Sequence, residues 1–97
     1  MSFQGGNEIM RFKAIEQLTN DQEQMQEIYE YLRSAKNELF NDNTPTSARI
    51  LAWDLRTTEQ HLNELCEKML QDRDHYPYVN MIHFADRKFY RYIGNGD

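Results

Sequence analysis

The sequence feature that most constrains the fold is a pair of apolar seams on either side of a short polar turn. The first seam has apolar residues spaced alternately three and four positions apart, at Met25, Ile28, Leu32, Ala35 and Leu39. The second has the same spacing with one polar member, Thr58, at Ala48, Leu51, Leu55, Thr58, Leu62, Leu65 and Met69. Such spacing gives a helix one narrow apolar stripe that packs against a partner helix.

The first helix is expected to begin in the polar run that starts at Thr19. Side-chain oxygens there can accept hydrogen bonds from the free amides of a helix start, and Thr19 with Gln22, or Asn20 with Glu23, has the spacing of a capping box. This helix should end at the turn 40–47, because short Asn and Asp side chains compete for backbone hydrogen bonds.

The second helix is expected to run from Pro45 to about Asp72. Thr44 can cap it, and a proline at the first helical position loses no amide hydrogen bond. Because the turn between the two seams is short, the helices should fold back on each other. The prediction is a mainly α fold, an antiparallel helical hairpin that forms one domain over residues 9–74.

Two flanking segments complete the expected organisation. Residues 1–8 are expected to be a flexible N-terminus or a cloning remnant, and a short helix should follow between Ile9 and Leu18. Residues 75–97 form an aromatic C-terminal extension, expected to pack on the same domain. Its residues 78–93 fit either a third helix with a stripe of apolar side chains or a β-hairpin, and the two alternatives stay open.

Composition narrows the functional classes. The net charge is −5, which argues against general nucleic-acid binding, because that needs clustered Lys and Arg over much of a surface. Cys66 is the only cysteine, so the chain has no internal disulfide and suits a reducing cytoplasm. No apolar run approaches the roughly 20 residues that span a bilayer. We therefore expect a cytoplasmic protein without membrane contact.

Catalytic and metal-binding motifs are not evident. The pair His61 and Glu64 shares a helix face, but a metal site needs further ligands and the first helix offers no second pair of this kind. A solvated helix face explains the pair better. We expect no enzyme activity, no metal and no cofactor.

One candidate binding surface lies on the second helix. Ile50 and Trp53 fall off the apolar seam, on a flank that an isolated hairpin would expose to water. Two explanations stay open: the aromatic C-terminal segment covers Trp53, or another subunit does. Because a two-helix hairpin has little interior of its own, a homo-oligomer with Ile50 and Trp53 in its interface is the default expectation.

Two groups of cations are candidate ligand sites. The C-terminal segment places positive charges among rings, which suits a phosphate beside a stacked base, at Arg87, Lys88, Tyr90 and Arg91. Solvated cations on an amphipathic element would explain the same run. The second group should converge near the turn and could bind an anion or form surface salt bridges, at Arg33, Lys36 and Arg49.

The order of several short features resembles a family of small phage proteins that sequester the cyclic oligonucleotide signals of CBASS antiviral defence. The similarity spans about residues 11–66 and rests on Arg11-Phe12, Thr19-Asn20-Asp21-Gln22, Tyr29-Glu30-Tyr31-Leu32-Arg33, Ala35-Lys36, Pro45-x-Ser47, Leu51-Ala52, Leu55, Glu59 and Asn63. Members of this family are helical hairpins that oligomerise and hold the nucleotide between subunits without cleaving it. The resemblance implies an anti-CBASS sponge in the host cytoplasm, with ligand-binding candidates Tyr29, Arg33, Lys36, Ser47 and Arg49.

A second hypothesis comes from the acidic character of the first helix. Carboxylates at Asp21, Glu23, Glu27 and Glu30 could imitate phosphate spacing toward a basic target. The alternative to a sponge is therefore an acidic inhibitor or adaptor of a host protein, of the anti-CRISPR or antitoxin-like kind.

Overall fold

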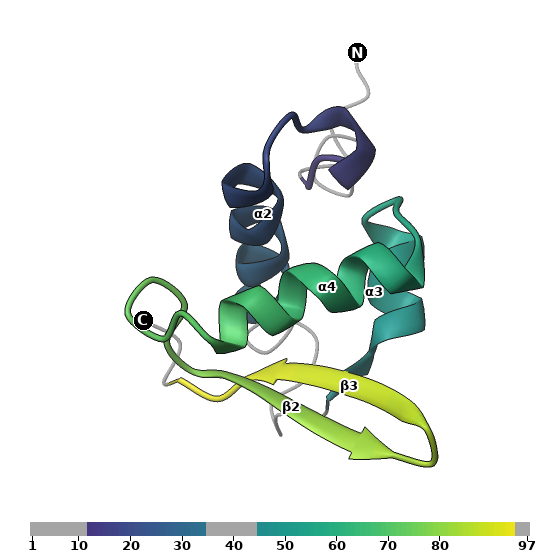
Figure 1. Cartoon of the computed structure of the whole chain (residues 1–97), viewed down its shortest axis with the longest axis vertical. Coiled ribbons are helices and arrows are strands. Elements are labelled where there is room, and N and C mark those ends of the chain that lie inside the picture. Colours follow the sequence, from purple (N-terminus) through teal and green to yellow (C-terminus); the bar gives the residue numbers. More distant parts are fainter. Residues whose placement is uncertain (1–11, 35–44, 95–97) are drawn as a thin grey trace.

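The computed structural model describes residues 12–34 and 45–94, which contain both helices and strands (Figure 1). The elements, in order, are the 3-10 helix η1 (Ile15–Gln17), α2 (Asp21–Ser34), β1 (Thr46–Ser47), α3 (Ala48–Asp54), α4 (Glu59–Leu70), β2 (Val79–Phe84) and β3 (Arg87–Tyr92). The strands form an antiparallel sheet of order β1-β3-β2. The prediction of a mainly α helical hairpin is therefore wrong, and the protein is a small α/β protein.

The expected single helix from Pro45 to Asp72 is broken in two by its own backbone. Arg56 adopts a left-handed conformation with φ of 58°. The amide of Thr57 then donates to the carbonyl of Ala52 at 2.9 Å, the hydrogen bond that closes a Schellman motif at a helix end. Thr58 starts the next helix at once, because its hydroxyl accepts a hydrogen bond from the amide of His61 at 3.1 Å. The polar residue inside the second seam is thus a helix cap.

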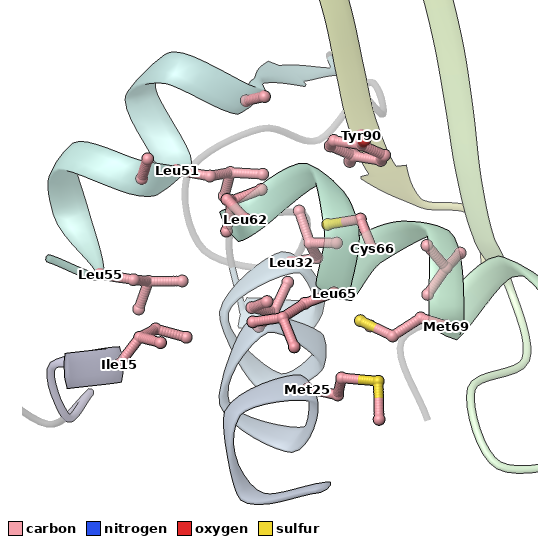
Figure 2. Packing of buried hydrophobic residues seen from close by; sticks show 14 of the residues in the cluster. Ile15, Met25, Leu32, Leu51, Leu55, Leu62, Leu65, Cys66, Met69 and Tyr90 are labelled. Atoms are coloured by element: carbon pink, nitrogen blue, oxygen red, sulfur yellow. The ribbon is translucent and has the colours of Figure 1, made fainter. Parts of the chain in front are cut away.

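The apolar members of the predicted seams are nevertheless buried wherever the structure describes them. Figure 2 shows seam residues of α2, α3 and α4 meeting in one core, together with Ile15 of η1, Cys66 of α4 and Tyr90 of β3. The buried seam members are Met25, Ile28, Leu32, Ala48, Leu51, Leu55, Leu62, Leu65 and Met69. Ala35 and Leu39 lie outside the described residues. In Figure 1, α4 crosses α2 instead of running antiparallel beside it, so the same stripes serve a different arrangement.

The C-terminal segment is a β-hairpin, which settles the alternative that the sequence left open. Its two-residue turn is Ala85-Asp86, with φ values of 53° and 64°. Positive φ at both central residues is what a type I′ turn requires, and that turn matches the natural twist of paired strands. The third-helix alternative is wrong, because the two halves of this segment pair as antiparallel strands, from Val79 with Tyr92 to Phe84 with Arg87.

The hairpin is held to the helices by buried aromatic rings. The Tyr29 ring of α2 meets the rings of Tyr76 and Tyr92 edge-on, each at 5.7 Å between centroids. Its hydroxyl donates to the carbonyl of Pro77 at 2.9 Å. On the other edge of the sheet, Ser47 of β1 pairs with Phe89 of β3. The sheet is therefore completed by residues that lie about 40 positions apart in sequence.

The segment before α2 closes one end of the core. Of the short helix expected between Ile9 and Leu18, the described part contains the single turn η1, whose Ile15 is buried and donates its amide to the carbonyl of Leu55 at 2.7 Å. One of the two predicted capping pairs, Asn20 with Glu23, is present at the start of α2. Oδ1 of Asn20 accepts a hydrogen bond from the amide of Glu23 at 2.9 Å.

Candidate functional site

The helices α3 and α4 form a helix-turn-helix. They are joined by the four residues 55–58, and the hairpin β2–β3 follows them and lies along α4 (Figure 1). The order along the chain is thus helix α2, short strand β1, helix α3, turn, helix α4 and hairpin β2–β3. In a helix-turn-helix, the second helix has one face on the core and the opposite face free for recognition. Here that second helix is α4.

The exposed face of α4 is polar and acidic. Its buried side carries Leu62, Leu65 and Met69, and its exposed positions are Glu59, Gln60, Glu64, Glu67 and Lys68. His61 is partly exposed at the edge of this face; its Nε2 lies 2.9 Å from the amide oxygen of Gln24, and its Nδ1 lies 3.8 Å from Glu64. Lys68 points toward α2, where it pairs with Asp21. The free face of α4 therefore presents carboxylates and one amide.

Cations flank this acidic face on both sides. From the hairpin, the Nζ of Lys88 lies 2.8 Å from Oε2 of Glu67, and Arg87 is exposed beside the turn. From the other side, Arg49 is exposed in the first turn of α3 and lines a depression together with Glu59. The helix-turn-helix surface thus has positive charge at its borders and negative charge along α4.

The cationic run of the C-terminal segment is divided between the two faces of β3, because side chains alternate along a strand. Lys88 and Tyr90 face α4; Tyr90 is fully buried, and its hydroxyl donates to Oδ1 of Asn63 at 2.7 Å. Burial raises the pKa of the Tyr90 phenol. Arg87 and Arg91 lie on the opposite face with Phe89. The four candidate residues therefore do not form one site, and Tyr90 serves the core.

The candidates near the first turn are only partly described. Arg33 lies in the last turn of α2, Arg49 lies at the start of α3, and Lys36 falls outside the described residues. The hydroxyl of Ser47 caps α3 by accepting from a backbone amide at 3.2 Å. The ring of Tyr29 belongs to the aromatic cluster of the core. Convergence of the three cations on one anion stays a prediction.

A second surface is centred on the indole of Trp53. Trp53 is 83% exposed and Ile50, one helical turn earlier on α3, is 53% exposed. Of the two explanations left open, coverage of Trp53 by the C-terminal segment is wrong, because Trp53 is exposed and β2 and β3 pack along α4. Trp53 lines two depressions of about 630 and 400 Å³, and Glu16 and Arg56 line the larger one with it. We call Ile50 and Trp53, with Glu16 and Arg56 beside them, the Trp53 surface.

The described residues offer little for catalysis. Cys66 is buried, and burial raises the pKa of its thiol, which disfavours the nucleophilic thiolate. Within residues 12–34 and 45–94, no three His, Cys, Asp or Glu side chains are grouped as metal ligands would be. In the same ranges, no helix combines the length and apolar composition that crossing a bilayer requires.

Sequence reasoning missed the helix-turn-helix. The available signal was the pair Thr57-Thr58 followed by Glu59, since a hydroxyl before an acidic first turn is typical of a helix start. Comparison of the chain with protein-family models, with curated proteins and with solved structures gives no match. A functional proposal for this protein therefore rests on the surfaces described above.

Proposed function

We propose that the protein binds duplex DNA through α4 and the adjoining hairpin. The proposal rests on one observation, the helix-turn-helix of α3 and α4 with the hairpin β2–β3 beside it. This arrangement leaves one face of α4 free, with α3 and the hairpin next to it. An α-helix fits the major groove of B-DNA, and helix-turn-helix proteins place their second helix there.

The distribution of charge supports the same orientation. The borders of the surface carry Arg49 on one side and Lys88 on the other, where the two phosphate backbones would run. The centre carries Gln60 and Glu64, where base edges would lie. A glutamine can bind adenine in the major groove, and a carboxylate can accept from the amino group of cytosine. Few cations and a net charge of −5 mean weak binding to unrelated sequences.

The test is selection of bound duplexes from a random library at about 50 mM salt, followed by anisotropy titrations of the enriched sequence. With about two phosphate contacts, the logarithm of the affinity should fall against the logarithm of salt with a slope of about −2. Arg49→Ala should reduce that slope by about 1, whereas the matched control Lys13→Ala, an exposed cation near the N-terminal end of the described chain, should leave it unchanged. Failure to enrich any duplex, or equal slopes for the two variants, would contradict the proposal.

A second candidate function follows from the carboxylates of α4. Glu59, Glu64 and Glu67 give this helix an acidic face, which favours the acidic adaptor or inhibitor that docks on a basic protein. The variant Glu64→Gln distinguishes the two functions, because each function predicts a different direction of change in binding. It should weaken binding to a basic protein partner, and it should preserve or increase the non-specific component of DNA binding.

The cyclic-oligonucleotide sponge also stays a prediction. Arg87 and Arg91 on the outer sheet face, with Phe89 between them, are the described residues that best suit a phosphate beside a base. Calorimetry with a panel of cyclic di- and trinucleotides tests it, and uniformly flat titrations would remove it. A cytoplasmic setting, in which the Cys66 thiol stays reduced, belongs to each of these proposals.

A further inference from the structure

The Trp53 surface adjoins the DNA contact proposed above, because Arg49 lines the smaller depression together with Ile50 and Trp53. Helix α3 buries Ala48, Leu51 and Ala52 on its inner face and still exposes its largest side chain, Trp53. An indole offers a large apolar area together with one hydrogen-bond donor, and such side chains are enriched where proteins meet. Ile50 extends the apolar area by one turn. This exposed pair is the kind of anchor around which interfaces are built.

We propose that the Trp53 surface joins two copies of this chain in a two-fold symmetric dimer. In such a contact the same patch meets itself, so that each residue of one copy faces a complementary residue of the other. Glu16 and Arg56 line the larger depression together with Trp53. Within the described residues, neither makes an ion pair in the monomer. A two-fold axis through the patch can therefore set Arg56 of each copy against Glu16 of the other.

Charge favours a second copy over another occupant. The whole chain has a net charge of −5, so most pairs of its surfaces repel each other. The Trp53 surface instead carries one anion and one cation and is neutral. Two copies can meet there without like-charge repulsion, whereas a strongly basic or acidic partner would find no net attraction.

Shape supports the same occupant. The depression that Glu16 and Arg56 line measures about 630 Å³ and has the side chain of Ala52 in its wall. It is open and large enough to accept the indole of a second copy. Reciprocal insertion would cover both Trp53 side chains and both Ile50 side chains in one contact. The dimer does not depend on whether α4 binds DNA.

The experiment uses the full chain and its single tryptophan. Sedimentation velocity gives the mass across a concentration series, and tryptophan emission gives the burial of Trp53 in the same samples. We expect the mass to double as concentration rises, with a blue shift of the emission over the same range. Trp53→Ser should stay monomeric, while the control Phe84→Ser, which removes an aromatic side chain that is 71% exposed on the hairpin, should dimerise like the parent.

Charge reversal then tests the geometry. Arg56→Glu and Glu16→Arg should each weaken dimerisation by about tenfold or more, because like charges then face each other across the axis. The double variant should restore it. A parent chain that stays monomeric, a Trp53→Ser variant that dimerises, or a double variant no better than the single ones would each overturn the proposal.

Discussion

Replacing Tyr90 by Phe tests the link between the hairpin and α4 with the smallest possible change. Tyr90 has no exposed surface, and its hydroxyl donates to Oδ1 of Asn63 at 2.7 Å. The ring itself belongs to the hydrophobic core (Figure 2). Tyr90→Phe therefore removes one hydrogen bond that ties β3 to the helix and leaves the packing of the ring in place.

The magnitude follows from the surroundings of the two partners. A hydrogen bond between neutral groups contributes about 0.5–1.5 kcal/mol to the free energy of unfolding. An acceptor left unpaired and fully buried would raise the cost toward about 3 kcal/mol. Asn63 is only partly buried, so water can reach its amide, and we expect a loss of about 1 kcal/mol. For a domain of this size, that lowers the melting temperature by about 4–8 °C.

The assay is urea unfolding followed by circular dichroism, for Tyr90→Phe, Asn63→Ala and the double variant. The double-mutant cycle should give a coupling energy of about 1 kcal/mol, because each single change removes the same hydrogen bond. Tyr78→Phe is the matched control: that ring is 52% exposed, and the change should stay within about 0.5 kcal/mol. A coupling energy near zero, or equal losses at Tyr90 and Tyr78, would refute the reasoning.

Three further outcomes are expected. Thr58→Ala should lower the free energy of unfolding by about 1 kcal/mol in the same urea assay, because it removes the side-chain cap of α4, while Thr57→Ala should have a smaller effect. Cys66 should react with a thiol reagent in the native protein far more slowly than in urea, since burial raises the pKa of its thiol; native labelling at the unfolded rate would contradict this. The hydrogen bond from Lys68 lowers the pKa of Asp21 below 3.8, so this pair stabilises the fold above that pH and ceases to do so as the pH falls through the lower folded value. As the pH is lowered, the urea midpoint of Lys68→Ala should therefore fall less steeply than that of the parent protein. Equal slopes for the two proteins would contradict a stabilising ion pair.

Local sequence determined which faces are buried and where one helix begins. The three-four spacing correctly marked Ile28, Leu51 and Leu62 as core, because a helix presents every third or fourth residue on one side whatever it packs against. The cap at Asn20 depends on neighbouring residues only, so it was also predictable. The same spacing could not tell two antiparallel helices from three crossing ones.

The tertiary structure decided the direction of the helices and the identity of the last segment. The break between α3 and α4 needs a left-handed backbone conformation at Arg56. A glycine there would have been a recognisable signal of a helix end, but an arginine is not. The hairpin gains its stability from burying Tyr90 against α4 and from pairing with β1, contacts that no local pattern contains. Exposure of Trp53 was foreseen from its position off the seam. Neither β2 nor β3 covers it, which depends on how the sheet lies against α4, and packing across the described chain sets that.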